Sequence, residues 1–202
     1  MFIILLHHML VYTISKTDEE LLQILELQKN NLPDNLSDEQ MASGGFVTLR
    51  HTLDLLKKQN AIEQNIIAKD HNRVIAYVLA LTVASRFDMP VLFPMFDAFD
   101  ELEYDQKKIS SYKYIVVGQV CVAADYRGKG VFDKCYYEYK NRFAGKYDFA
   151  ITEISTRNYR SKNAHHRIGF KSIHNYIDPD GAGWEVVLWD WRKINPFKTN
   201  PG

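Results

Sequence analysis

The chain has 202 residues, which is enough for one compact domain with a sizeable core. Hydrophobic residues make up 46% and charged residues 25%, a balance typical of soluble globular proteins rather than disordered or fibrous ones. Lysine and arginine together number 25, as do aspartate and glutamate, so the sequence argues against a basic surface that binds nucleic acid.

Two features bear on where the protein works. The first ten residues are apolar except for His7 and His8, whereas a membrane-spanning helix needs about twenty such residues. No basic segment precedes this run, so a signal peptide is not favoured, and an extra edge strand is an alternative. Cys121 and Cys135 are too few for a disulfide framework or a four-ligand zinc site, and they suit a reducing compartment as buried thiols. We therefore expect a cytoplasmic protein with no membrane contact and no metal.

The first part of the chain alternates enough over residues 11–16 to predict a strand. Thr17 and Glu20 then form the pattern of a capping box, and the apolar spacing that follows predicts an amphipathic helix over residues 18–30. Ser37 and Gln40 repeat the pattern for a short second helix, which the pair Gly44-Gly45 ends. A further short helix is expected over residues 52–59.

Next come two β-rich runs, at residues 66–68 and 74–83, and the polar segment between them predicts a hairpin. Residues 84–113 lack strand periodicity and are expected to form an inserted loop with one helix. Five carboxylates lie within residues 97–105, interleaved with aromatic residues. Such a segment suits either a lid over a cationic amine substrate or a solvated helix that packs by one aromatic face, and both readings stay open.

The second half of the chain alternates between strands and helices. Residues 114–123 form a near-continuous apolar run, typical of a strand buried on both faces. After it we expect a helix at 131–143, a strand at 149–154, a helix at 158–168, and strands at 170–176 and 184–191. The prediction is an α/β domain with a mixed, mostly antiparallel twisted sheet flanked by helices.

The most informative stretch joins the buried strand to the helix that follows it, through the turn Arg127-Gly128-Lys129-Gly130. Glycines let successive backbone N–H groups point into one concavity, and the helix N-terminus adds partial positive charge. Such a turn can hold a phosphate or pyrophosphate. Its spacing fits neither the P-loop, because Val131 replaces the hydroxyl residue, nor the dinucleotide fingerprint, because Lys134 replaces the third glycine.

This turn resembles motif A of the GNAT acetyltransferase superfamily, Arg/Gln-x-x-Gly-x-Gly/Ala. It matches at Arg127 and Gly130 and departs at Phe132, where the family usually has glycine or alanine. Downstream, the segment from Asn158 to Phe170 resembles the family's motif B, Asn-x-x-Ala-x-x-Leu-Tyr-x-x-x-Gly-Phe. The order of the elements also agrees, so the resemblance covers residues 11–192, with 84–113 as an insertion and 193–202 as a tail.

The resemblance implies an N-acetyltransferase with splayed central strands that bind acetyl-CoA, or another acyl-CoA, between them. The acceptor would be a small-molecule or peptide amine that attacks the thioester directly, and a homodimer is possible within the family. By position in the two motifs, the cofactor-binding residues would be Val120, Cys121, Val122, Arg127, Gly128, Lys129, Gly130, Val131, Phe132, Asn158 and Ser161.

Two residues are candidates for catalysis. The family's leaving-group acid is commonly a tyrosine, and His165 stands in its place; a histidine is partly protonated at neutral pH and could protonate the departing thiolate. The alternative is a histidine that only packs. Glu153 is the best-placed carboxylate for a general base, unless strand alternation turns it outward. Because neither role is certain from sequence, a non-catalytic acyl-CoA-binding module of the same fold is the alternative function.

Overall fold

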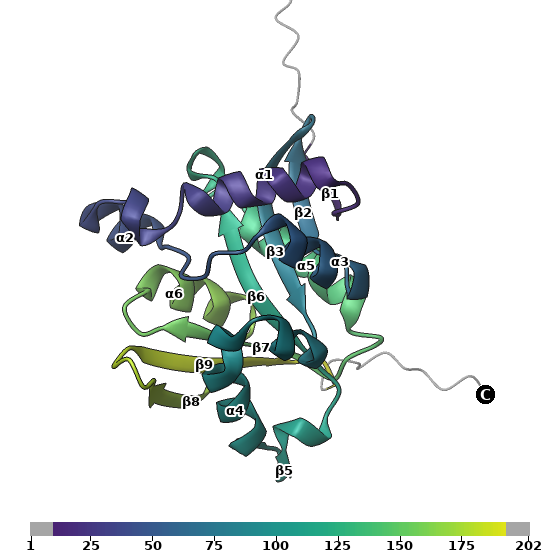
Figure 1. Ribbon diagram of the computed structural model, residues 1–202, viewed down its shortest axis with the longest axis vertical. Helices are drawn as coiled ribbons and strands as arrows, with labels where there is room; N and C mark the ends of the chain where they lie inside the picture. Colours follow the sequence, from purple (N-terminus) through teal and green to yellow (C-terminus); the bar gives the residue numbers. More distant parts are fainter. Residues whose placement is uncertain (1–9, 193–202) are drawn as a thin grey trace, which may run out of the picture.

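Seven strands form one sheet in the order β1-β2-β3-β6-β7-β9-β8, with helices on both faces (Figure 1). The computed structural model describes residues 10–192, so almost all of the apolar extension predicted at 1–10, and all of the tail at 193–202, lie outside the described residues. Strands β6 and β7 pair in parallel, and the other neighbours in the sheet are antiparallel. The predicted mixed, mostly antiparallel sheet is confirmed.

The predicted elements are present with small shifts at their ends. The sheet strands are β1 (Val11–Ile14), β2 (Ile66–Asp70), β3 (Arg73–Leu81), β6 (Tyr114–Val122), β7 (Phe149–Ser155), β8 (Lys171–Ile177) and β9 (Gly183–Asp190). The α-helices are α1 (Asp18–Lys29), α2 (Asp38–Gly44), α3 (Leu53–Ile62), α4 (Phe93–Glu101), α5 (Val131–Phe143) and α6 (Tyr159–Ile168). A separate two-stranded pairing joins β4 (Glu103–Tyr104) and β5 (Lys107–Lys108).

Local chemistry explains where the helices begin. Thr17 and Ser37 both form complete capping boxes, in which each side chain accepts from a backbone N–H three residues on and the side chain at that position reaches back. The pair of glycines ends α2, because Gly45 has a φ of 73°, which few other residues tolerate. These sequence signals act within one turn, and each predicted helix start lies within a residue of its observed position.

Each face of the sheet carries its own apolar core. Helix α5 contributes Tyr136, Tyr139 and Phe143, all fully buried, to the core on one face. Helices α1 and α3 pack on the opposite face of β2 and β3, and Figure 1 shows them in front of the sheet with α5 behind. Farther along that same face, α4 packs against β6, β7 and β9. Both cysteines are buried, which raises the pKa of each thiol to about 12, as the prediction of buried thiols requires.

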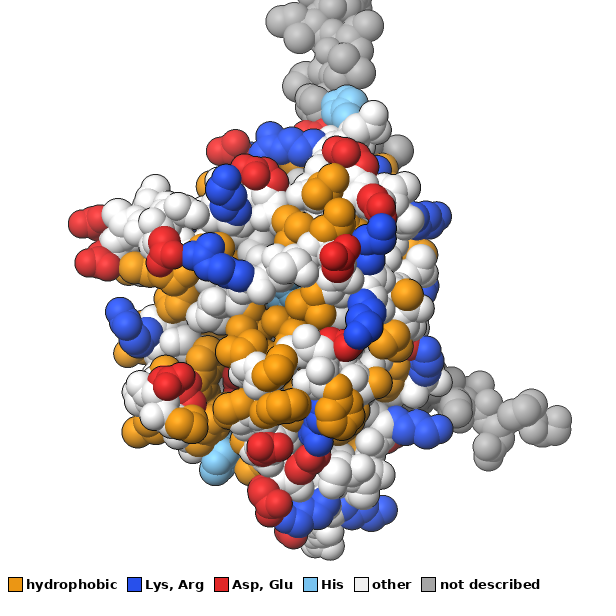
Figure 2. All heavy atoms as spheres, viewed as in Figure 1, with side chains coloured by type: hydrophobic (Ala, Val, Ile, Leu, Met, Phe, Trp, Pro, Cys, Tyr) orange, Lys and Arg blue, Asp and Glu red, His pale blue; other side chains and the backbone are white. Residues whose placement is uncertain are grey.

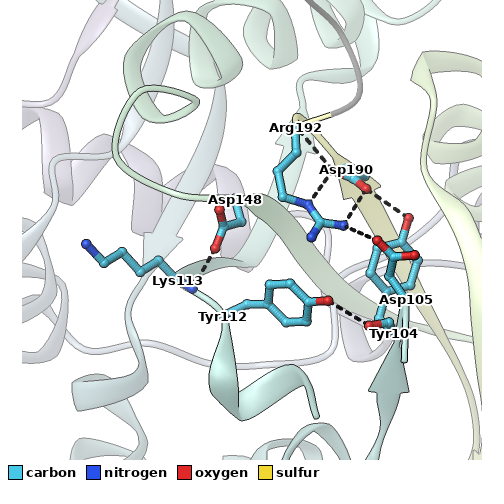
Figure 3. Close-up of polar contacts among 7 residues, drawn as sticks. All are labelled: Tyr104, Asp105, Tyr112, Lys113, Asp148, Asp190 and Arg192. Atoms are coloured by element: carbon cyan, nitrogen blue, oxygen red, sulfur yellow. Dashed lines mark hydrogen bonds and ion pairs between the residues drawn. The ribbon is translucent and has the colours of Figure 1, made fainter. Parts of the chain in front are cut away.

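The inserted segment is a packed part of the domain. As predicted, it carries one α-helix, α4, which buries Met95, Phe96 and Phe99 against the sheet. At its far end, Arg192 after β9 bridges Asp190 and Asp105, and the Tyr104 hydroxyl donates to Asp190 at 3.1 Å (Figure 3).

Three of the five carboxylates within residues 97–105 lie close to cations. Arg86 holds Asp100 at 2.8 Å, Lys108 lies 3.4 Å from Glu101, and Arg192 lies 3.4 Å from Asp105. Surface ion pairs of this kind leave little net field for attracting a distant cation. The geometry therefore favours the helix that packs by its aromatic face over a lid for cationic amines. No helix within residues 10–192 is long and apolar enough to cross a membrane.

Candidate functional site

The two central strands separate partway along their length. Strands β6 and β7 pair only from Tyr114–Phe149 to Val116–Ile151, and beyond that point they are no longer paired. Just past the last paired residues, the hydroxyl of Thr152 in β7 donates to the Val117 carbonyl of β6 at 2.8 Å. Parallel strands that stop pairing leave backbone groups of both strands available to a third chain or ligand.

A bulge in β6 accompanies this separation. The register between β3 and β6 shifts between Val78 and Ala80, so that Gly118 and Gln119 of β6 stand opposite one residue of β3. A Cβ added to Gly118 would overlap the Cδ1 atom of Leu81. The Leu81 side chain therefore occupies the space that any larger residue at Gly118 would need.

Replacing Gly118 with alanine is expected to destabilise the fold. The added methyl group has no space beside Leu81, so the free energy of unfolding should fall by about 1–3 kcal/mol, measured by urea denaturation. Gly145→Ala serves as the control because a Cβ there meets no atom within 4 Å. Combining Gly118→Ala with Leu81→Val, which removes Cδ1, should recover part of the loss, and a double variant as unstable as Gly118→Ala would contradict this account.

The glycine turn after β6 forms the cradle that the sequence predicted. Gly128 and Gly130 have φ values of 72° and 76°, and Gly130 is the N-cap of α5. A Cβ added to either glycine would meet no protein atom within 4 Å, so both face open space. The first backbone N–H groups of α5 have no partner within the helix and carry its positive end. The turn can therefore hold an anionic group at the start of α5.

A cavity of about 390 Å³ lies along the cradle and the separated part of β6. Ten of the eleven residues predicted to bind the cofactor line it: Val120, Cys121, Val122, Arg127, Gly128, Gly130, Val131, Phe132, Asn158 and Ser161. The exception is Lys129, whose ammonium group lies 5.6 Å from the centre of the Tyr126 ring. The structure thus gathers residues from both motifs around one cavity.

One wall of the cavity was not predicted. Residues 44–47, at and just after the end of α2, line it together with Asn31, which follows α1. The Asn158 side chain donates to the Phe46 carbonyl at 2.8 Å, and Val47 N–H donates to the Asn31 carbonyl at 3.0 Å. In the sequence, Gly44-Gly45 was read only as the end of a helix. Nothing local to this segment reveals that it contacts Asn158 and lines a cavity with residues of β6.

The side chain of Arg127 helps to fix this wall. Its Nε donates to the Val122 carbonyl at 3.0 Å, and its guanidinium also donates to the side chain of Asn31. Arg127 therefore joins the end of β6 to Asn31, which follows α1. Asn158 caps α6 by accepting from Ser161 N–H at 3.2 Å, so each motif supplies one residue that anchors the wall.

Charged groups at the cavity are mostly cationic. Arg160 and Arg167 of α6 line it with Arg127, against the single carboxylate of Asp133 in the first turn of α5. Asp133 is paired with Arg167 at 2.5 Å, which offsets a negative charge that would otherwise oppose an anion at this helix end. The balance of charges suits a polyanionic ligand.

His165 is buried beside the cavity and does not line it. Its Nδ1 lies 2.8 Å from the Ser161 carbonyl and so donates, which leaves Nε2 to accept from the Tyr136 hydroxyl at 2.6 Å. The rings of Phe132 and Phe170 contact it edge-on. Burial lowers the pKa of His165 to about 4, against the opposing effect of the Ser161 hydrogen bond. These contacts favour the packing role, and the acid role stays a prediction.

Replacing His165 with phenylalanine separates the two roles. The Tyr136 hydroxyl would lose its acceptor, so the free energy of unfolding should fall by about 1–3 kcal/mol. If His165 also protonates the leaving thiolate, turnover should fall on the order of 10²-fold while acyl-CoA affinity is kept. A folded variant with unchanged turnover would assign that proton to another donor, such as water or Tyr159.

Glu153 lies on β7 just beyond the end of the parallel pairing. It follows Ile151 by two residues, so by strand alternation both face the side of the sheet that carries α4. The Tyr176 hydroxyl of β8 donates to its carboxylate. Burial raises the pKa of Glu153 to about 7; the Tyr176 hydrogen bond lowers it and the charge of Asp178 raises it further. A carboxyl group with this pKa can accept a proton near neutral pH.

Among the described residues, no group of three or more histidine, cysteine, aspartate or glutamate side chains could hold a metal ion. No protein-family model matches the sequence, and no curated protein matches it.

Solved structures, by contrast, match the fold over nearly the whole chain. A chain of the NatC complex bound to Gag peptide and CoA has a TM-score of 0.61 and 12% identity, covering 90% of this chain and 98% of that one. The ribosomal-protein-S18-alanine N-acetyltransferase from Escherichia coli has a TM-score of 0.55 and 11% identity, covering 94% and 98%. A structure from Desulfovibrio desulfuricans, assigned to the GNAT family, has a TM-score of 0.59 and 9% identity, covering 91% and 99%. The chain therefore has the fold of the GNAT acetyltransferase superfamily.

Proposed function

We propose that this chain is an acyl-CoA-dependent N-acyltransferase that moves an acetyl group from acetyl-CoA to a primary amine by direct attack. The observation that carries the proposal is the cradle of Gly128 and Gly130, which opens onto the cavity beside the separated strands. The backbone of the turn would hold the pyrophosphate, with Arg160 and Arg167 adding positive charge around it. Val120 and Val122 would offer strand backbone groups to the pantetheine arm.

The reaction needs one proton acceptor and one proton donor. Attack by the neutral amine forms a C–N bond and breaks the C–S bond of the thioester, so the amine loses a proton and the sulfur gains one. We assign the acceptor role to Glu153, because its pKa of about 7 leaves it partly ionised at neutral pH on the face opposite α5. The sulfur would take its proton from His165 or from water.

The acceptor is proposed to be an amine of a peptide or a small molecule. Two of the structures with this fold concern peptide or protein amines: one holds a Gag peptide, and the other is named for an alanine of ribosomal protein S18. At 11–12% identity this likeness supports the class of acceptor and not its sequence. The homodimer and the cytoplasmic location expected from the sequence stay predictions.

One observation favours the alternative, a module that binds acyl-CoA without turnover. Both ring nitrogens of His165 are hydrogen-bonded within the protein, so the residue in the family's acid position has no proton directed at a ligand. Thiol release from acetyl-CoA across a panel of amines, with calorimetry on the same sample, distinguishes the two functions. Amine-dependent release of thiol supports the enzyme, binding without release supports the module, and absence of binding overturns both.

A further inference from the structure

A buried hydrogen-bond network lies on the α1 side of the sheet, at the bulge where β6 leaves β7. It joins Gln28 of α1, His51 before α3, Tyr77 of β3 and Gln119 of β6, and all four side chains are more than nine-tenths buried. Gln28 Nε2 donates to Gln119 Oε1 at 2.7 Å, and the Tyr77 hydroxyl donates to the same oxygen at 2.6 Å. Gln119 Nε2 donates to the Leu49 carbonyl at 3.0 Å. The proposed mechanism uses none of these groups.

The network fixes which nitrogen of His51 carries the proton. The backbone N–H of His51 donates to Gln28 Oε1 at 2.8 Å, which sets the orientation of the Gln28 amide. Gln28 Nε2 therefore faces His51 Nδ1, at 2.8 Å, and an amide NH₂ group can only donate. Nδ1 must accept. Burial lowers the pKa of His51 to about 4, so the ring is neutral at pH 7 and its one proton lies on Nε2.

That proton has no acceptor within the described residues. His51 Nε2 is buried and without a hydrogen-bond partner, although the rest of the network is satisfied. Leaving a buried donor unpaired costs about 1–3 kcal/mol. The ring cannot turn to avoid this cost, because its contact with Gln28 holds it in one orientation. The cost is explained if a ligand supplies the missing oxygen.

The position of the network indicates which ligand. Val120 and Cys121, directly after Gln119, line the cavity, and so does Val47, two residues before Leu49. The network thus lies behind residues that line the cavity, at the bulge of β6, and none of its own four side chains is part of the lining. Figure 2 shows hydrophobic side chains gathered on this face between α1 and α4.

We infer that His51 Nε2–H donates a hydrogen bond to a carbonyl oxygen of the bound reactants, and that Gln28 and Gln119 are the positioning residues that fix this tautomer. The inference rests on the proposed acyl transfer. A protonated Nε2 donates to an oxygen acceptor and cannot take a proton from an ammonium group. Two oxygens fit: the thioester carbonyl, or a carbonyl adjacent to the amine, as in an aminoacyl group.

Kinetics with His51→Phe and His51→Gln separate the two sources. Phenylalanine keeps a ring without a donor, whereas glutamine keeps an amide N–H near the place of Nε2. Two acceptors of similar size are compared, alaninamide with a carbonyl beside its amine and propylamine without one, and calorimetry gives the affinities for CoA and acetyl-CoA. Thermal unfolding of both variants controls for the loss of the Gln28 contact.

One hydrogen bond is expected to be worth about tenfold. If the thioester carbonyl is the partner, His51→Phe lowers acetyl-CoA affinity or kcat about tenfold for both acceptors while CoA affinity is kept. If the acceptor carbonyl is the partner, only the KM for alaninamide rises. In either case His51→Gln should recover part of the loss. A folded His51→Phe variant with wild-type values for both acceptors and for acetyl-CoA overturns the inference.

Nitrogen-15 spectra of the imidazole test the inference without any turnover. At pH 7 the wild-type spectrum should show His51 protonated at Nε2 alone. In Gln28→Glu, where a carboxylate faces Nδ1, the proton should move to Nδ1. If the wild type transfers no acyl group to any amine, the proposed function fails; a shift of the Nε2–H signal on adding acetyl-CoA but not CoA would then still support the His51 contact. Protonation of Nδ1 in the wild type contradicts it.

Discussion

Gly130→Asp is expected to reduce CoA affinity about 100-fold or more while the protein stays folded. Gly130 has a φ of 76° at the N-cap of α5, and the direction of its missing Cβ is open. An aspartate there adds a side chain in the space through which a pyrophosphate must approach, and it places a negative charge at the positive end of the helix. Calorimetric titration with CoA measures the change.

The matched control is Gly181→Asp. Gly181 also has a positive φ, 84°, and a Cβ there meets no atom within 4 Å, but it lies in the turn between β8 and β9, away from the cavity. Both variants place an aspartate at a glycine of positive φ, and both add the same charge. Only Gly130→Asp should lose CoA binding, and an equal loss in both would show that strain rather than the cradle is responsible.

Glu153→Gln is expected to lower turnover on the order of 10²- to 10³-fold at pH 8, with little change in acyl-CoA affinity. The base must be ionised to accept the amine's proton, so the wild-type kcat/KM should rise as pH increases through about 7. The variant keeps the shape of the side chain and a hydrogen-bond acceptor for Tyr176. Its kcat/KM should not show this rise with pH. If kcat/KM of the variant still rises through about pH 7, another group is the base.

The ionisation of Glu153 that favours turnover should lower the stability of the folded protein. Because burial raises the pKa of Glu153 from 4.5 to about 7, the folded protein holds an extra proton between those pH values, and the wild-type free energy of unfolding should fall as pH rises through that window. Glu153→Gln should remove this loss and be the more stable protein at pH 8.

Glu185→Gln is the control for that measurement. Burial raises the pKa of Glu185, but its contacts with Lys162, Ser172 and His166 together lower it by more. The same substitution should therefore destabilise the protein above pH 4.5. Chemical denaturation across the pH range measures both variants, and a shared sign would contradict the assignment.

Much of the fold was predictable because its signals are local. The capping boxes at Thr17 and Ser37 involve residues within one turn, and the glycine turn at Gly128 and Gly130 lies between a strand and a helix that are adjacent in the chain. Neither the strand order nor the parallel pairing of β6 with β7 was predicted. Sequence periodicity shows that a strand exists and does not show which strand lies beside it.

The sequence predicted the site only where the two motifs specify the backbone conformation. Residues 44–47 carry no motif, and their place at the cavity depends on contacts with Asn31 and Asn158, which are distant in the sequence. His165 was placed on the helix of motif B, but the Tyr136 hydroxyl that donates to its Nε2 comes from another helix, α5. For Glu153 the undetermined quantity was the phase of alternation, which the pairing of β7 with its neighbours decides.

A crystal structure of the protein with acetyl-CoA tests the central claim most directly. We expect the pyrophosphate oxygens within hydrogen-bond distance of the backbone N–H groups at the start of α5, the pantetheine arm beside Val120 and Val122, and the acetyl group at the separation of β6 and β7. A nucleotide bound elsewhere on the molecule, with the space beside Gly128 and Gly130 still free of ligand, would contradict the proposed function.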